Sequence, residues 1–215
     1  MKEFQRDFIA YAIQSGVLRF GEFVLKSGRL SPYFFNTGLF NTGEHLDKLG
    51  RFYAQAYLDQ GIVADVLYGP AYKGIPLVCA ASIALSRASG LTVPFAFNRK
   101  EAKDHGEGGL LVGASVHGKV LIVDDVITAG TSVRESVEII RAAGAEPCGV
   151  LIALDRQEQG NGGVSAIAEV MERYAMPVFS IINLAHIIDY LGQHGSTEQL
   201  AAISSYRERY GVHAD

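Results

Sequence analysis

The segment from Val120 to Ser132 restricts the possible folds of this chain more than any other stretch. It opens with Val-Leu-Ile-Val, and such a branched apolar run is typical of a strand buried on both faces of a parallel sheet. The strand runs into two carboxylates, Asp124 and Asp125, and a Thr-Ala-Gly-Thr-Ser run then leads into a helix. Ligands of open α/β sheets bind at the carboxyl ends of strands, and a helix N-terminus offers unpaired N–H groups to a phosphate. The segment therefore predicts a site for a ribose phosphate.

From the residues alone a plainer interpretation stays open, because the acid pair can be a solvated strand end and Thr131 or Ser132 an ordinary N-cap. The complete run, however, resembles the phosphoribosyl-diphosphate (PRPP) binding motif of the type I phosphoribosyltransferases. The resemblance implies the type I phosphoribosyltransferase fold. It also implies that the following residues bind PRPP: Asp124, Asp125, Val126, Ile127, Thr128, Ala129, Gly130, Thr131 and Ser132.

The rest of the chain alternates between strand and helix patterns. We expect strands over residues 63–68, 92–98, 119–124, 146–154 and 178–182, and helices over 44–60, 74–88, 131–143, 164–174, 185–191 and 197–210. The alternation predicts an α/β protein with a mainly parallel, doubly wound sheet flanked by helices. Before it, a helix from Phe4 to Ile13 and a hairpin of 20–25 with 33–36 predict a small N-terminal hood lobe. We expect a single domain over 1–215, with about 1–40 forming the hood and about 41–215 the core.

Composition limits the location and the partners. A net charge of −4 argues against a general nucleic-acid surface, so any anion site must be local. The N-terminus has no apolar signal core, and no apolar run approaches the length that crosses a membrane. Cys79 and Cys148 lie in apolar runs and indicate buried thiols in a reducing compartment. We therefore expect a cytoplasmic protein that binds neither nucleic acid nor a membrane.

A second turn from strand to helix, Gly69-Pro70-Ala71-Tyr72-Lys73-Gly74, is expected to open at the same edge of the sheet. Its backbone N–H groups and the charge of Lys73 suit a pyrophosphate, although a plain loop with an exposed lysine fits these residues equally well. Tyr72-Lys73-Gly74 is similar to the pyrophosphate loop of orotate phosphoribosyltransferases, which implies that Tyr72 and Lys73 bind PRPP. The resemblance also suggests a non-proline cis peptide near Ala71-Tyr72, which would need dense local support.

The segment from Arg99 to Gly109 is charged and ends in glycines. A polar surface loop is one interpretation, and a lid that closes over a polyanion and excludes water is the other. The segment closely resembles the catalytic loop of orotate phosphoribosyltransferases, which enters the active site of the partner subunit. The resemblance implies a homodimer in which the 99–109 loop acts in trans. It also implies a set of residues that bind PRPP and take part in catalysis, with Lys103 dominant for rate: Arg99, Lys100, Lys103 and His105.

Further stretches match the base-recognition residues of that family. Ser31 to Gly38 is similar to the segment that packs on orotate, although its Phe-Phe pair alone more often belongs to a core. Arg156 follows the expected strand over 146–154 and, taken alone, is an ordinary surface arginine. In the family it faces the substrate carboxylate, which a planar guanidinium suits. The resemblance implies the following orotate contacts, of which the lysine also contacts PRPP: Lys26, Phe34, Phe35, Thr128 and Arg156.

The reaction that the resemblance implies is transfer of the 5-phosphoribosyl group from PRPP to orotate, giving orotidine 5′-monophosphate and pyrophosphate in pyrimidine biosynthesis. Asp124 and Asp125 would hold the ribose hydroxyls and stabilise a developing cation, while cations of the other loops would take up charge on pyrophosphate. Mg²⁺ is the expected cofactor, bridged by PRPP and water near the acid pair instead of held mainly by protein. A phosphoribosyltransferase for another base and a non-catalytic PRPP-sensing regulator of the same fold are the alternatives.

Overall fold

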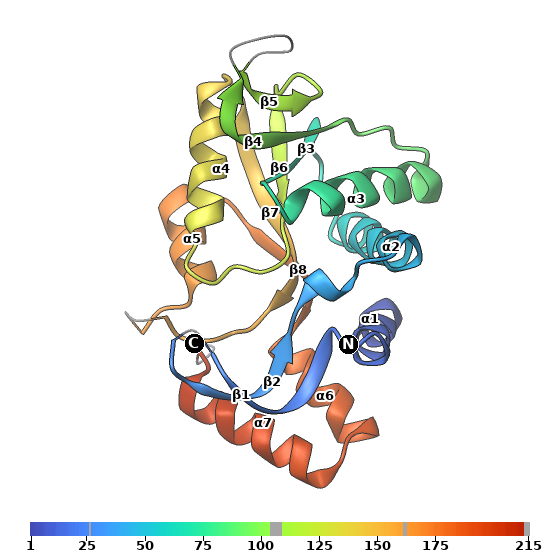
Figure 1. The fold of residues 1–215 in the computed structure, drawn as a ribbon, viewed down its shortest axis with the longest axis vertical. Coiled ribbons are helices and arrows are strands. Elements are labelled where there is room, and N and C mark those ends of the chain that lie inside the picture. The colour runs from blue at the N-terminus through green and yellow to red at the C-terminus, as the bar shows by residue number, and fades with distance from the viewer. Residues whose placement is uncertain (26, 104–108, 161–162, 213–215) are drawn as a thin grey trace.

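A six-stranded sheet forms the centre of the molecule, and a two-stranded hairpin lies below it in Figure 1. The computed structural model describes residues 1–25, 27–103, 109–160 and 163–212, and within these ranges every side chain except those of residues 102 and 103. The helices are α1 (Glu3–Gln14), the 3-10 helix η1 (Thr37–Leu39), α2 (Gly43–Asp59), α3 (Gly74–Ser89), α4 (Thr131–Ala142), α5 (Ala166–Tyr174), α6 (Leu184–His194) and α7 (Thr197–Tyr210). The strands are β1 (Leu18–Val24), β2 (Leu30–Phe35), β3 (Val66–Gly69), β4 (Phe95–Lys103), β5 (Gly109–Gly113), β6 (Lys119–Val123), β7 (Glu146–Asp155) and β8 (Val178–Asn183).

The strand before the acid pair, β6, lies inside the sheet, as its apolar sequence predicts. The strand order is β5-β4-β3-β6-β7-β8, and every neighbouring pair is parallel except β4 with β5. Leu121 of β6 pairs with Leu67 of β3 on one side and with Gly149 of β7 on the other. Because β3, β6 and β7 are neighbours that run in one direction, the loops that follow them open at one edge of the sheet. The predicted mainly parallel α/β sheet is confirmed.

Helices cover both faces of this sheet (Figure 1), and the side chains of β6 alternate between them. Val120 and Ile122 join a hydrophobic cluster that also contains residues of α4 and α5. Leu121 and Val123 join a larger cluster with residues of α1, α2 and α3 on the opposite face. All of these β6 side chains are at most 1% exposed, so the strand is anchored from both sides. Among the helices of the described ranges, none has both the length and the apolar character needed to span a membrane.

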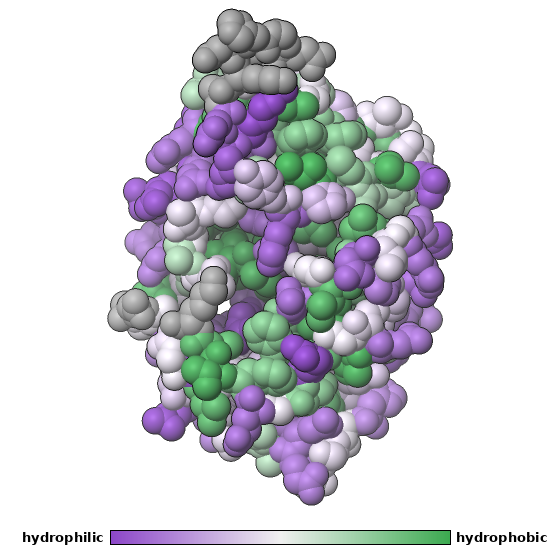
Figure 2. Space-filling view, in the orientation of Figure 1, coloured by the Kyte–Doolittle hydropathy of each residue, from purple (hydrophilic) through white to green (hydrophobic). Residues whose placement is uncertain are grey.

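The N-terminal hairpin packs against the carboxyl-terminal helix (Figure 1). β1 and β2 pair in antiparallel orientation. The ring of Tyr33 on β2 meets the ring of Tyr206 on α7 edge to face, with centroids 6.2 Å apart. Val24 and Leu30 of the hairpin are exposed, and hydrophobic residues gather over this part of the surface in Figure 2. The expected hood is therefore a hairpin that is held on one side by α7.

The charged segment differs from its predicted structure. We predicted a loop over 99–109, but β4 continues to Lys103 and β5 begins at Gly109, and these two residues pair across an antiparallel ladder. Backbone pairing at a sheet edge requires no apolar side chains, which is why the polar residues 99–103 concealed the end of β4. The other arm, β5, carries the apolar run Leu110-Leu111-Val112, a signal that the prediction did not use. The prediction of buried cysteines was also too strong, because Cys79 and Cys148 are free thiols that are only partly buried at the rim of the larger cluster.

Candidate active site

Asp125, the second acid of the pair, joins three parts of the chain at the carboxyl edge of the sheet. Lys73, from the loop between β3 and α3, places its Nζ 2.8 Å from Asp125 Oδ2. Thr37 of η1 donates its hydroxyl to the same oxygen at 2.8 Å. The backbone N–H of Val126 donates to the other carboxylate oxygen, also at 2.8 Å. The pyrophosphate-type loop, the acid pair and the end of the hairpin lobe therefore meet at one side chain, as the strand order requires.

Asp124 is held by a different set of donors. Ser132 donates its hydroxyl to Oδ2 at 2.8 Å, and the backbone N–H of Asp125 donates to Oδ1 at 2.9 Å. Tyr53 of α2, which is fully buried, donates its hydroxyl to the Asp124 carbonyl oxygen at 2.7 Å. Burial, together with the neighbouring charge of Asp125, raises the pKa of Asp124 to about 6. A buried carboxylate with remaining lone pairs is a strong acceptor for the hydroxyl of a ligand.

The loop between β3 and α3 is fixed through its backbone. The bond between Ala71 and Tyr72 is a non-proline cis peptide, as expected. Asn98 of β4 accepts hydrogen bonds on one oxygen from the Ala71 N–H at 2.9 Å and from the Tyr68 hydroxyl at 3.0 Å. Tyr72 is 70% exposed, and the side chain of Lys73 is 60% exposed. The loop thus presents its tyrosine and lysine to solvent from a backbone that is held in place.

The loop from β6 to α4 ends in an open helix N-terminus. Gly130 has φ +67°, a left-handed conformation that glycine adopts without strain, and α4 begins at the next residue. Within the described residues no side chain caps this helix, so its first N–H groups are available to an anion. Thr128 and Ala129 are exposed before it. A cavity of about 240 Å³ adjoins the helix start and is lined by Thr131, Ser132 and Pro70 among others.

Only part of the charged segment can be placed. Arg99 donates from Nη1 to the Gly109 carbonyl at 3.0 Å and so connects the base of the two arms. Lys100 places its Nζ 3.7 Å from a carboxylate oxygen of Glu135 on α4, and both side chains are about half exposed. Lys100 also lines the cavity at the start of α4. Three predicted residues cannot be assessed because they lie outside the described residues: Lys26, His105 and the side chain of Lys103.

Arg156 is not an ordinary surface arginine, because its side chain is only 14% exposed. Its guanidinium lies over the ring of Tyr33, 4.5 Å from the centroid. Nε donates to Glu158 Oε1 at 2.8 Å, and Nη2 lies 2.7 Å from the same oxygen. The contact at Nη2 is an ion pair without hydrogen-bond alignment, so among the described residues this buried nitrogen has no well-aligned acceptor. Arg156 is therefore a buried cation at the sheet edge with unused donor capacity.

The phenylalanine pair divides between the core and the hairpin surface. Phe35 packs edge to face on Phe8 of α1, with ring centroids 6.4 Å apart. Phe34 stacks on Phe23 across the hairpin at 5.5 Å. Both side chains are half-buried, but Phe35 packs against the larger core cluster, whereas Phe34 lies against the other strand of the hairpin. Both belong to β2, the strand that leads to Thr37 and so to Asp125.

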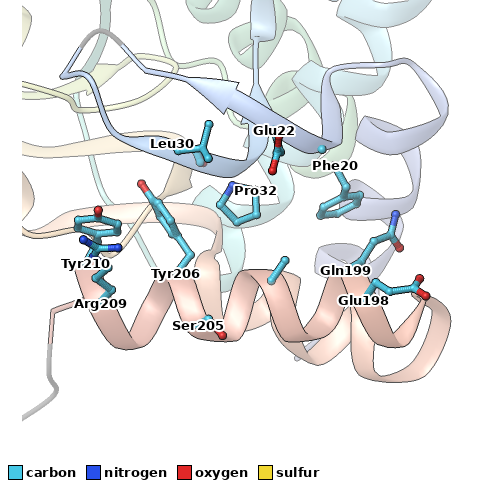
Figure 3. Close-up of a pocket in the computed structure, with 13 residues that line it drawn as sticks. Phe20, Glu22, Leu30, Pro32, Glu198, Gln199, Ser205, Tyr206, Arg209 and Tyr210 are labelled. Atoms are coloured by element: carbon cyan, nitrogen blue, oxygen red, sulfur yellow. The ribbon is translucent and has the colours of Figure 1, made fainter.

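A larger groove lies between the hairpin and α7 (Figure 3). Its volume is about 540 Å³, and it is lined by Leu30 and Pro32 from the hairpin and by Tyr206 and Tyr210 from the helix, among others. None of the predicted site residues that the structure describes lies in its wall. We therefore place the candidate active site at the carboxyl edge of the sheet, where the paired acids, the cations and the open helix N-terminus meet.

Sequence reasoning missed several residues that hold this site together. Thr37, Tyr53 and Asn98 come from different elements, and they contact residues 88, 71 and 30 positions away. No spacing in the sequence signals such contacts, because tertiary packing alone creates them. Glu158 is different, since it follows Arg156 by two positions. An opposite charge so close to a predicted site arginine was a signal that could have been read.

Similarity to known proteins places the chain in a family. Residues 37–161, more than half of the chain, match the phosphoribosyl transferase domain family. An orotate phosphoribosyltransferase of Methylococcus capsulatus is 66% identical over 212 residues, which cover 99% of this chain and 100% of that protein. The chain belongs to the orotate phosphoribosyltransferase family. An orotate phosphoribosyltransferase of Pseudomonas aeruginosa is 58% identical over 213 residues. The aligned residues cover 99% of this chain and 100% of that protein.

The fold agrees with that of a solved member of the orotate phosphoribosyltransferase family. The crystal structure from Francisella tularensis matches with a TM-score of 0.88 and 42% identity, over 95% of this chain and 99% of the other. The expected type I phosphoribosyltransferase fold is therefore confirmed, and the chain is an enzyme of the phosphoribosyltransferase class. The matched domain starts at Thr37 and includes the acid pair and Arg156, so every contact described above for Asp125 lies within it.

Proposed function

We propose that this enzyme transfers the 5-phosphoribosyl group of PRPP to orotate and releases pyrophosphate, in the synthesis of the pyrimidine nucleotide UMP. Relatives named for this reaction match the full length of the chain, which supports the proposal. Within the chain, the observation that favours orotate is Arg156, a buried guanidinium whose Nη2 has no well-aligned acceptor among the described residues. A planar substrate carboxylate would complete its hydrogen bonds.

The donors and acceptors around the acid pair suit PRPP. The N–H groups from Thr128 to Ser132 would bind the 5′-phosphate at the open start of α4. Asp124 and Asp125 would accept hydrogen bonds from the ribose hydroxyls. To do so, Asp125 would exchange its bond to Lys73 for one to the substrate, which frees the lysine for pyrophosphate. Tyr72, Arg99 and Lys100 would lie around the same group, with Lys103 and His105 added from the lid.

In the proposed reaction the bond from ribose C1′ to pyrophosphate breaks, and its electron pair leaves with pyrophosphate. A ring nitrogen of orotate, whose proton has already passed to water, forms the new bond to C1′ with its electron pair. Positive charge develops on the ribose meanwhile, and the carboxylates of Asp124 and Asp125 would stabilise it. Lys73 and Lys103 would neutralise the departing pyrophosphate. Arg156 would orient orotate together with Thr128, Lys26 and the hairpin phenylalanines, so that the two reactants are held in line.

Mg²⁺ would be bound mainly through PRPP and water near the acid pair. Among the described residues no group of three or more histidine, cysteine, aspartate or glutamate side chains lies together as a metal site. The donor set fits an ion that is held largely by substrate, because Asp125 is paired with Lys73 and Asp124 keeps lone pairs to which no described residue donates. When bound, the ion neutralises charge on the pyrophosphate.

We also propose a homodimer in which the 99–109 segment of one subunit completes the site of the other. The β4–β5 arms lie at the top of the molecule in Figure 1, and the hairpin lies in its lower half. Arg156 directly follows β7, which β3 and β6 separate from β4 in the strand order. This separation of the arms from Arg156 supports action on a partner subunit. The net charge of −4 supports the remaining part of the proposal, a cytoplasmic enzyme without a nucleic-acid or membrane partner.

The reaction can be tested with the purified enzyme. In the presence of Mg²⁺ and PRPP, we expect orotate to be consumed, followed by the loss of its ultraviolet band, while adenine and uracil are not. Consumption of adenine or uracil in place of orotate would identify an enzyme for another base. Binding of PRPP without turnover of any of the three bases would identify a non-catalytic sensor.

Replacement of Arg156 tests the proposed reading of the carboxylate. Arg156→Ala should raise the KM for orotate, with a loss of about 2–5 kcal/mol if the ion pair with substrate is buried, while the KM for PRPP changes little. Arg173→Ala, which removes an exposed arginine of α5, is the matched control and should leave both constants unchanged. A normal orotate KM in Arg156→Ala would contradict the assignment.

A further inference from the structure

Glu158 lies at one edge of the Arg156 guanidinium, and a second edge is formed by other donors of the same group. A guanidinium presents donors along two edges, one formed by Nε and Nη2 and the other by the two terminal nitrogens. Glu158 Oε1 lies 2.8 Å from Nε and 2.7 Å from Nη2, so it lies at the first edge. The alignment is good only at Nε, and Nη2 remains a buried donor in need of an acceptor. This geometry leaves a place for a second carboxylate on the same arginine.

Several contacts fix Glu158 itself. Its Oε1 accepts a hydrogen bond from the hydroxyl of Tyr33 at 3.1 Å, and the Tyr33 ring also supports the guanidinium from below. Burial raises the pKa of Tyr33 well above its usual value, so this hydroxyl stays a donor. The backbone of Glu158 forms an antiparallel bridge with Gly211, just after α7. The next N–H, of Gln159, donates to the Tyr210 carbonyl at 2.8 Å. The carboxylate is thus held from the hairpin and from the carboxyl-terminal end of the chain.

We propose that Glu158 is a positioning residue that holds Arg156 in the orientation needed to bind the carboxylate of orotate. The inference rests on the proposed function, because it requires Arg156 to read that carboxylate. With Glu158 on the Nε edge, the guanidinium cannot rotate about its long side chain, and its buried charge is balanced before substrate arrives. The substrate carboxylate then uses the remaining edge, and Glu158 itself does not touch the substrate.

The position of the glutamate allows a competing role with the opposite sign. A carboxylate beside Arg156 could instead occupy the place of substrate, so that orotate must displace it. Removal of Glu158 would then strengthen orotate binding. If Glu158 positions the arginine, its removal must weaken orotate binding. The direction of the change in orotate KM therefore separates the two roles.

The test compares Glu158→Ala and Glu158→Gln with the wild-type enzyme. Glu158→Ala should raise the orotate KM by roughly tenfold, because a loosened arginine loses its alignment, while kcat and the PRPP KM change less than about twofold. Glu158→Gln keeps an oxygen that can accept from Nε, so it should restore most of the affinity. Glu172→Ala, on the exposed side of α5, is the matched control and should not change any constant. A lower orotate KM in Glu158→Ala, or an equal loss toward both substrates, would overturn the proposal.

A second pair of measurements keeps the proposal testable if Glu158→Ala folds poorly. Tyr33→Phe removes only the hydroxyl that donates to Glu158 and keeps the ring below Arg156, so it should raise the orotate KM about two- to threefold. In the Arg156→Ala background, the same Tyr33→Phe substitution should have no further effect on the orotate KM, since a positioning contact acts only through its partner. An additive effect in that background would contradict the inference. Failure of the wild-type enzyme to use orotate would refute the proposed function instead, and the two failures are thereby distinguished.

Discussion

Two adjacent carboxylates, both less than 10% exposed, are stabilised by different means at the end of β6. The Asp125 carboxylate forms an ion pair with Lys73 and accepts a hydrogen bond from the Thr37 hydroxyl. Among the residues that the structure describes, the Asp124 carboxylate accepts hydrogen bonds from the Ser132 hydroxyl and from one backbone N–H. The unequal environments explain why the pKa of Asp124 rises to about 6, through burial first and the charge of Asp125 second. An acid pair that reads as uniform in the sequence is therefore electrostatically asymmetric.

The asymmetry predicts how stability depends on pH. The folded state binds a proton at Asp124 more tightly than the unfolded chain does, because the pKa rises from 3.8 to about 6 on folding. The stabilisation of the folded state by this proton is complete below about pH 4 and is lost as the pH rises through about 6. Asp124→Asn removes the charge, so it should increase the free energy of unfolding at pH 8 by up to about 3 kcal/mol relative to its effect at pH 4.

Urea unfolding of both proteins at the two pH values measures this difference. Asp7→Asn, at an exposed position of α1, is the matched control and should show no such gain. The same Asp124→Asn variant should raise the PRPP KM and lower turnover, because the ribose hydroxyls lose a charged acceptor. A stability difference that does not change between pH 4 and pH 8 would show that Asp124 is ionised at little cost.

At the scale of elements, α2 and α3 approach each other through Gly50. A Cβ added at this position would lie 2.7 Å from the carbonyl carbon of Ala80 on α3 and closer still to its oxygen. An alanine in a helix normally stabilises by about 0.5–1 kcal/mol relative to glycine. At Gly50 we expect the alanine to destabilise the fold instead, because the backbone of α3 cannot move aside as a flexible side chain can.

We therefore expect Gly50→Ala to lower the free energy of unfolding by about 1–3 kcal/mol, measured by chemical denaturation. Gly192→Ala in α6 supplies the matched control. Nothing lies within 4 Å of a Cβ built at Gly192, so this variant should be neutral or stabilising. Equal effects of the two substitutions would show that helix propensity, and not the close approach of α2 and α3, decides the outcome.

The elements that the sequence predicts well are those whose burial leaves a pattern. Val120 to Val123 is apolar throughout because both faces are covered, and the motif that follows it identifies the edge where ligands bind. The end of β4 leaves no such pattern, because edge pairing uses backbone groups beneath polar side chains. The roles of Tyr53 and Asn98 could not be predicted for a related reason. The Tyr53 hydroxyl and the Asn98 amide form hydrogen bonds with residues that are distant in the sequence and become neighbours only in the folded chain.

For the whole molecule, the residues of the proposed site are spread across the carboxyl edge of the sheet. Arg156 and its partner Glu158 follow β7 and lie with the hairpin and α7, whereas the arms that carry the predicted lid extend from β4, on the other side of β3 and β6 in the strand order. Lys100 contacts Glu135 of its own α4. A lid that serves another subunit reconciles this separation with a site that needs both parts, since a twofold dimer can bring the arms of each subunit over the other.

Mixing two inactive variants tests this shared site. Lys103→Ala disables the lid and leaves the core intact, while Arg156→Ala disables the core and leaves the lid intact. If the lid acts in trans, a heterodimer of the two contains one site with a normal core and a normal lid and should have about half of the wild-type activity. An equal mixture that reassociates at random, in which about half of the dimers are heterodimers, should therefore recover about a quarter. If the lid acts within its own subunit, each site keeps one defect and mixing recovers nothing. Each variant alone, unfolded and refolded in the same way, is the control, and activity is measured at saturating PRPP with orotate well below the raised KM of Arg156→Ala.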